Sequence, residues 1–180
     1  MKFLVAIFLA AAICSCSTTY ELIKVEKPNL IGIKSHQTKG TIFKRSYSFI
    51  PGSFSVVDSA NRFTPTVNDI AQAERILKEQ IKHLNKDQPN QFGNCPDIRN
   101  NLNSYFRQYV GFYDKEDKVI HVNLLWNKYS IKEKLIGISD PRMSFDDDYT
   151  IPFDSCSNYW RLDINLTTNQ ALNLKVNGVG

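Results

Sequence analysis

The stretch Thr66–Asn85, TVNDIAQAERILKEQIKHLN, decides the fold class, because it predicts the one long helix of the chain. Its apolar residues recur every three or four positions and therefore share one side of a helix. They are Ile70, Ala73, Leu77, Ile81 and Leu84, with Ile76 beside them. One such stripe must be buried against another layer of the fold.

Both ends of this helix have local signals. Thr66 and Asp69 are spaced as a capping box, with Thr64-Pro65 as an alternative start. Pro89 prevents continuation beyond the end. Glu74 and Lys78, four residues apart, are predicted to pair on the exposed side of the helix.

Four strands in two hairpins are predicted after the helix, because apolar and polar residues alternate there with period two. Turns are expected near residues 114–117 and 167–170. The residues predicted to face the helix are Phe106, Val110 and Phe112, then Ile120, Val122, Leu124 and Trp126, then Trp160, Leu162, Ile164 and Leu166, and finally Leu172, Leu174 and Val176. The expected fold is α+β, with one long helix packed on a curled antiparallel sheet of four or more strands.

A helix followed by a four-stranded antiparallel meander resembles the cystatin-like class of folds in element order. The resemblance implies a sheet curled around one helix. Such scaffolds host inhibitors, ligand binders and enzymes alike, so the order of elements does not predict a function.

The first residues read as an export signal. Lys2 precedes the uncharged run Phe3–Ile13, which is too short to span a bilayer. Ile13-Cys14-Ser15-Cys16 resembles the cleavage site of bacterial lipoprotein signals, which implies cleavage before Cys16 and several acyl chains on that cysteine. The alternative is an ordinary secretory signal cleaved near Ser17. The predicted division is a signal at 1–15, a lipidated N-terminus and tether at 16–40, and a single α+β domain at 41–180.

Two cysteines remain in the predicted mature chain, Cys95 and Cys156. In an exported protein they are expected to pair, closing a loop of about 60 residues worth roughly 4 kcal/mol. Such a bridge would brace the insertion between the two hairpins, residues 127–155. A catalytic or metal-binding thiol is the alternative, although neither cysteine belongs to a C-x-x-C pair.

Residues 89–180 resemble a set of small lipoproteins of the Bacteroidota. The shared stretches include RQYVG (107–111), NLLWN (123–127), DSCSNYW (154–160) and VNG (176–178). That set has no assigned activity, so the resemblance implies a location and no chemistry. Ser17 lies next to the predicted lipidated cysteine, where an aspartate can favour inner-membrane retention, and this favours the outer membrane.

Catalytic and metal-binding signatures are missing from the sequence. It has no H-E-x-x-H, G-x-S-x-G, P-loop or G-x-G-x-x-G motif. The acidic run Asp146-Asp147-Asp148 lacks the order of an EF-hand loop and is expected to be a solvated loop, with Ca²⁺ binding as the alternative. We expect no cofactor and no metal. A net charge of +4, or +3 once Lys2 is removed, does not indicate nucleic-acid binding.

The exposed face of the predicted sheet is the candidate binding surface, because aromatic and arginine side chains are enriched at interfaces. Its residues are Tyr105, Arg107, Tyr109, His121, Tyr159 and Arg161. The alternatives are a solvated face, or a face covered by the insertion or by N-terminal strands, of which a short one could form at 20–25 and two are predicted within 42–59. We expect a membrane-anchored, non-enzymatic binding module for an envelope protein or glycan. A structural accessory subunit and an envelope hydrolase with a non-contiguous site are the alternatives.

Overall fold

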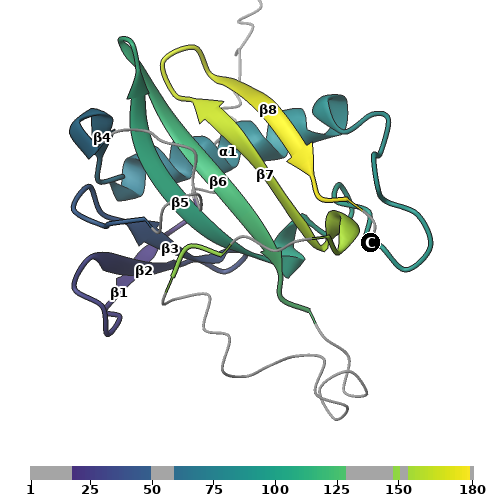
Figure 1. The fold of residues 1–180 in the computed structure, drawn as a ribbon, viewed down its shortest axis with the longest axis horizontal. Coiled ribbons are helices and arrows are strands. Elements are labelled where there is room, and N and C mark those ends of the chain that lie inside the picture. The colour runs from purple at the N-terminus through teal and green to yellow at the C-terminus, as the bar shows by residue number, and fades with distance from the viewer. Residues whose placement is uncertain (1–17, 50–58, 129–147, 151–153, 179–180) are drawn as a thin grey trace, which may run out of the picture.

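The computed structural model describes residues 18–49, 59–128, 148–150 and 154–178. The protein is α+β, with one helix packed on a large, mostly antiparallel sheet of eight strands (Figure 1). The strand order is β1-β2-β3-β5-β6-β7-β8, and the short strand β4 pairs with β5 off this path. The sheet is not strongly curled, so the predicted curl around the helix is wrong.

The helix α1 spans Val67–Leu84, as the apolar stripe predicts. The capping box is confirmed, since the Thr66 hydroxyl accepts from the Asp69 amide and the Asp69 carboxylate accepts from the Thr66 amide. These bonds satisfy amide groups that a helix start leaves without partners. The stripe packs against the sheet and forms one hydrophobic core with strand residues that include Ile120, Leu124 and Leu162, and only Leu84 at the helix end is partly buried.

The predicted meander follows the helix. β5 (Tyr105–Asp114), β6 (Asp117–Trp126), β7 (Tyr159–Asn165) and β8 (Gln170–Val176) pair antiparallel in that order. The predicted phase is confirmed for β6 and β7, whose apolar residues face α1. The three 3-10 helices η1 (Ser59–Asn61), η2 (Leu102–Ser104) and η3 (Cys156–Asn158) form the short connections before β4, β5 and β7.

The N-terminal residues extend the sheet, which differs from the tether predicted for residues 16–40. β1 (Glu21–Ile23), β2 (Leu30–Lys34) and β3 (Lys39–Phe43) form an antiparallel series. β3 lies parallel to β5, a pairing that the intervening helix makes possible because parallel neighbours need a long crossover. Leu30 and Ile33 are buried, so these strands belong to the domain.

The phase predicted for β5 is wrong. Its register pairs Arg107 with Leu124 and Tyr109 with Val122, so these polar residues share the face that packs on α1. Val110 and Gln108 face the other side. The alternation in β5 is ambiguous because both sets of positions contain large aromatic residues. Arg107 can be buried because it pairs with Glu74 of α1.

A bulge changes the last strand. The register between β7 and β8 shifts between Arg161 and Asp163, and Asn173 opposite has a left-handed φ of 55°. Asparagine adopts this conformation more readily than most residues, and a bulge turns its neighbours. Leu172, predicted to be buried, is therefore 42% exposed, while Ala171 takes the buried position.

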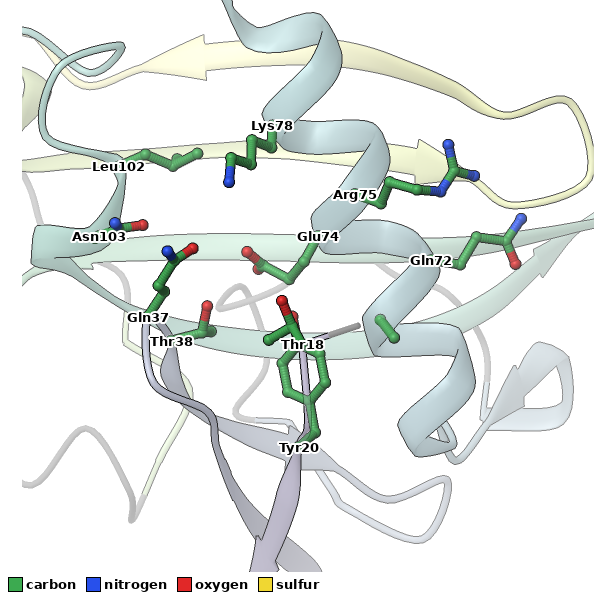
Figure 2. A pocket seen from close by; sticks show the side chains of 11 residues that line it. Thr18, Tyr20, Gln37, Thr38, Gln72, Glu74, Arg75, Lys78, Leu102 and Asn103 are labelled. Atoms are coloured by element: carbon green, nitrogen blue, oxygen red, sulfur yellow. The ribbon is translucent and has the colours of Figure 1, made fainter. Parts of the chain in front are cut away.

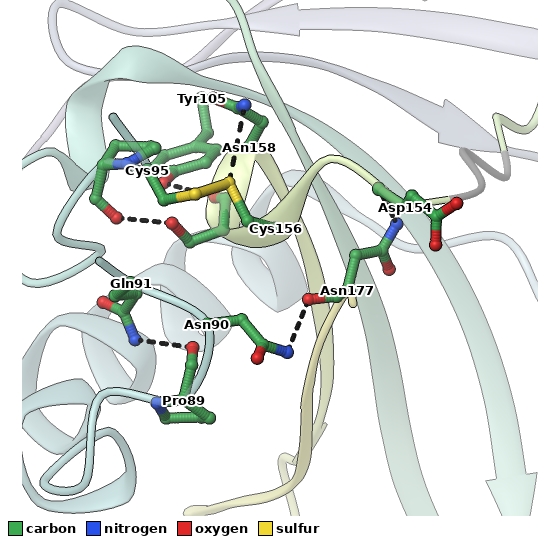
Figure 3. Close-up of a disulfide and its surroundings, with 11 residues drawn as sticks. Pro89, Asn90, Gln91, Cys95, Tyr105, Asp154, Cys156, Asn158 and Asn177 are labelled. Carbon is green, nitrogen blue, oxygen red and sulfur yellow. Dashed lines mark hydrogen bonds between the residues drawn. A yellow bond between two sulfur atoms is a disulfide. The ribbon is translucent and has the colours of Figure 1, made fainter. Parts of the chain in front are cut away.

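The disulfide between Cys95 and Cys156 is confirmed (Figure 3). It joins the loop after α1 to η3, directly before β7. The same loop is held to the end of β8, because the Asn90 side chain donates to the Asn177 carbonyl at 2.7 Å. The bridge therefore ties the helix end to the last hairpin, while most of the predicted insertion lies outside the described residues.

Removing the bridge should lower stability without changing the fold. We expect Cys95→Ser/Cys156→Ser to lower the free energy of unfolding by about 4 kcal/mol, because a loop of this length is then free in the unfolded chain. Urea unfolding with and without reductant measures this. Equal midpoints for the oxidised and reduced protein would contradict it.

Candidate functional site

The structure does not bring the six predicted face residues together. Tyr105, Arg107 and Tyr109 lie under α1 and are at most 2% exposed. His121 lies on the opposite face of the sheet and is 7% exposed. Tyr159 and Arg161 lie on that same opposite face and are half-buried. The predicted single binding surface is therefore wrong, because β5 presents the other set of its side chains.

The outer face of the sheet, opposite α1, is covered in part by two segments. Tyr149 packs on Phe43 and Phe49, with ring centroids 5.8 Å and 5.4 Å apart. Gln108 donates to the Asp148 carbonyl and accepts from the Thr150 amide. The described end of the insertion, residues 148–150, and the segment 47–49 after β3 therefore cover this part of the face, whereas the N-terminal strands extend the sheet.

His121 lies at the centre of a polar chain under this cover. Its Nδ1 lies 2.7 Å from an Asp163 carboxylate oxygen and its Nε2 lies 2.9 Å from the Tyr149 hydroxyl. Asn173 donates to the second Asp163 oxygen. Burial raises the pKa of Tyr149, so the hydroxyl beside His121 keeps its proton. An acid, an imidazole and a hydroxyl in this order resemble an acid–base relay, but both ring nitrogens are occupied and the group is buried. We interpret the chain as a structural tie between β6, β7 and the covering segment.

This tie should weaken in acid. Burial alone would raise the pKa of Asp163, but the contacts with His121 and Asn173 outweigh it and lower that pKa. A carboxyl with a lowered pKa stabilises the fold fully above its unfolded value of about 3.9 and loses that contribution as pH falls through the folded value. The Asp163→Asn variant should therefore be about 1–2 kcal/mol less stable at neutral pH, with the gap closing in acid.

Urea unfolding of both proteins across that pH range tests this expectation. The control Asp114→Asn removes an exposed carboxylate at the β5–β6 turn and should change stability by less than about 0.5 kcal/mol. A gap between the Asp163 variant and the parent that stays constant down to acid pH would refute the role of the charge.

Glu74 is the buried charge on the helix side. Its Oε1 accepts from Arg107 Nε at 3.1 Å and from the Tyr109 hydroxyl at 2.8 Å. The predicted surface pair with Lys78 is therefore wrong, because Glu74 turns inward to β5. β3 can lie this close to β5, beside Arg107, only because residue 40 is glycine. A Cβ on Gly40 would lie 2.5 Å from the Arg107 carbonyl oxygen.

The protonation states of this cluster follow from burial and from Glu74. Burial acts to lower the pKa of Arg107, but the charge of Glu74 outweighs it and raises that pKa, so the guanidinium stays charged. Burial and then Glu74 raise the pKa of Tyr109 well above its usual value. The same two causes raise the pKa of Tyr20 to about 12. The cluster is thus a carboxylate surrounded by one cation and protonated hydroxyls.

A pocket of about 470 Å³ opens above Glu74, between α1, the chain leading into β1, and η2. Its lining includes Thr18, Tyr20, Gln37, Thr38 and Asn103. In Figure 2 the side chains of Glu74 and Lys78 point toward Gln37 and Asn103, whereas Arg75 extends away, toward the far side of the helix. Arg75 pairs there with Glu79 and contacts Asn169.

A second pocket of about 390 Å³ adjoins the first, because both are lined by Gln37, Thr38 and Asn103. It adds Lys39 and Lys128 to the lining. We call the two pockets together the groove. Its polar side chains are mainly amides and hydroxyls, which can both donate and accept hydrogen bonds.

The groove has an excess of positive charge. Lys39, Lys78 and Lys128 form no ion pair with another described residue. The one carboxylate in the lining, Glu74, is balanced by Arg107. A concave surface with uncompensated ammonium groups and many hydrogen-bonding side chains suits a small anionic ligand.

Sequence reasoning missed most of this groove. Thr18, Tyr20, Gln37 and Thr38 were assigned to the tether, so no contact with the helix was expected. Glu74 did leave a signal, because Ile70, Glu74, Leu77 and Ile81 recur at spacings of four, three and four. A charge on an apolar stripe predicts a buried partner of opposite sign.

Two remaining predictions concern metals and membranes. Among the described ranges, no group of three or more metal-ligating side chains occurs. Asp148 binds Lys27 and Tyr47, while Asp146 and Asp147 lie outside the described residues. Within the same ranges, no helix has the length and apolar character needed to cross a bilayer.

Comparisons with protein families, with curated proteins and with solved structures find no match to this chain.

Loss of the Glu74 charge should destabilise the fold strongly. We expect Glu74→Gln to lower the free energy of unfolding by about 3 kcal/mol, because Arg107 is then left buried without its counter-charge. Thermal and urea unfolding measure this. The control Glu79→Gln, which removes an exposed pair on the same helix, should change stability by less than about 0.5 kcal/mol. Equal effects of the two substitutions would contradict the assignment.

Proposed function

We propose that the chain is a lipid-anchored, non-enzymatic binding protein of the bacterial cell envelope, whose groove binds an anionic, hydroxyl-rich glycan. The observation that carries the proposal is the groove, whose lining combines amide and hydroxyl side chains with Lys78 and Lys128, neither of which forms an ion pair with a described residue, and with Lys39, whose ammonium lies over the Phe106 ring. Sugars present hydroxyls that such side chains can bind in pairs, and a phosphate or carboxylate would bind the ammonium groups.

The buried Glu74–Arg107 pair supports a binding role for this region. A buried ion pair contributes little net stability compared with apolar residues of similar size, so its presence needs a reason other than stability. Here it places a carboxylate oxygen at the floor of a pocket, with Oε1 already engaged by Arg107 and Tyr109. Perturbed charges in a concave site are typical of functional sites.

The location rests on Ile13-Cys14-Ser15-Cys16 and on the resemblance to lipoproteins of the Bacteroidota. Lipidation of Cys16 anchors the chain, and Ser17 favours the outer membrane. We also propose that the order of elements is cystatin-like. This resemblance predicts no function, because that scaffold serves many roles. The groove is therefore the reason to propose ligand binding.

The anchor and the groove should be separable by mutation. Cys16→Ser should move the protein from the membrane fraction to the soluble fraction and remove the diacylglycerol mass from its N-terminus. The purified Cys16→Ser protein should still bind N-acetylglucosamine 1-phosphate, and at least about tenfold more tightly than N-acetylglucosamine, because of the phosphate. Fractionation, mass spectrometry and isothermal titration measure these outcomes.

A matched pair of variants locates the binding. Lys78→Glu should weaken sugar-phosphate binding about tenfold, whereas Lys82→Glu, one turn further along α1 and outside the lining, should leave it unchanged. Both variants should remain in the membrane when Cys16 is intact. Binding of neither sugar, or equal binding of both, would refute the anionic-glycan groove.

A further inference from the structure

The groove lies close to the predicted anchor. Thr18 lines the pocket above Glu74 and comes two residues after Cys16 in the chain. Two residues span at most about 7 Å even when fully extended. The headgroup layer on each side of a bilayer is roughly 5–7 Å thick. One wall of the groove is therefore within about one headgroup layer of a lipidated Cys16.

The neighbouring strand has features that suit a bilayer surface. Leu22, on the edge strand β1, is an apolar side chain that is 56% exposed. It follows Thr18 by four residues, so it is also within a short distance of the anchor. An exposed leucine beside a lipidated terminus can insert among headgroups, which would hold β1 and the groove against the membrane.

The charge of the groove matches the ligand that a membrane offers at this position. Lys39, Lys78 and Lys128 have no ionic partner among the described residues, and lysines near anionic lipids attract them. The amides of Gln37 and Asn103 lie where the two pockets meet, so they can bind hydroxyls next to a phosphate. A tethered site also meets membrane lipids at high effective concentration, so weak intrinsic affinity suffices.

Building on the proposed function, we propose that the anionic group bound in the groove is the phosphate of a lipid headgroup in the same leaflet that holds Cys16. The headgroup hydroxyls bind the amide and hydroxyl side chains of the groove, and the acyl chains stay in the bilayer. The protein thus binds a lipid, or a glycan borne on a lipid phosphate, beside its own anchor.

The test uses the mature chain with Cys16→Ser, which keeps every described residue but has no acyl chains of its own. It is mixed with vesicles of phosphatidylcholine, with or without phosphatidylglycerol, and binding is measured by flotation. We expect binding only to the vesicles that contain phosphatidylglycerol. Lys78→Glu should weaken it about tenfold and Lys82→Glu less than twofold.

Three outcomes would overturn the proposal. Equal losses of vesicle binding in Lys78→Glu and Lys82→Glu would indicate that general surface charge, and not the groove, binds the vesicles. Binding of free glycerol phosphate as tightly as phosphatidylglycerol vesicles would indicate a ligand taken from solution. Binding of the sugar phosphate without binding of either vesicle would refute the lipid source and leave the proposed function standing. Binding of neither the sugar phosphate nor the vesicles would refute the lipid source and the proposed function together.

Discussion

The Glu74 carboxylate, held between the Arg107 guanidinium and the Tyr109 hydroxyl, is the contact on which the rest of the structure depends. Charged and polar groups buried between a helix and a sheet, as these three are, are tolerated only when each has a partner. That requirement fixes which face of β5 meets α1, and it favours glycine at position 40, where β3 approaches β5. It also places an acidic group at the bottom of a pocket rather than on the surface of the helix.

The two faces of the sheet consequently have different roles. On the outer face, His121 and Asp163 hold Tyr149 and the short covering segment, and a small aromatic cluster of Phe43, Tyr47 and Phe49 closes over the strands. Its polar groups have one another as partners, so this network is a tie within the fold. On the helix side the groove is lined by Lys78, which has no ionic partner among the described residues, and a charge of this kind is available to a ligand.

The position of the groove connects the proposed anchor with the proposed ligand. A tether from Cys16 through residue 40 would have placed a binding site far from the membrane, but β1 begins at Glu21 and Thr18 already lines the pocket. The domain therefore begins almost at Cys16, the residue proposed to be lipidated. A lipid on Cys16 would hold the groove near the membrane surface with little reach beyond it, which favours the proposal of a ligand presented at that surface.

Local sequence patterns determined the elements whose signals are complete within a short stretch. The α1 capping box, the apolar stripe and the strands β6 and β7 follow from such signals. The pairing of Cys95 with Cys156 followed from the cysteine count of the predicted mature chain. Tertiary structure alone decided the rest. β5 has large residues on both faces, so its phase depended on Glu74 some thirty positions earlier. β1 and β2 are too short to show a period and are held by pairing with each other and, through β2, with β3. Leu172 turned outward because of a bulge opposite β7. The groove is built from segments that only this packing brings together, since Lys39, Lys78 and Lys128 come from three separate stretches of the chain and only Lys78 shares a stretch with Glu74 at the floor.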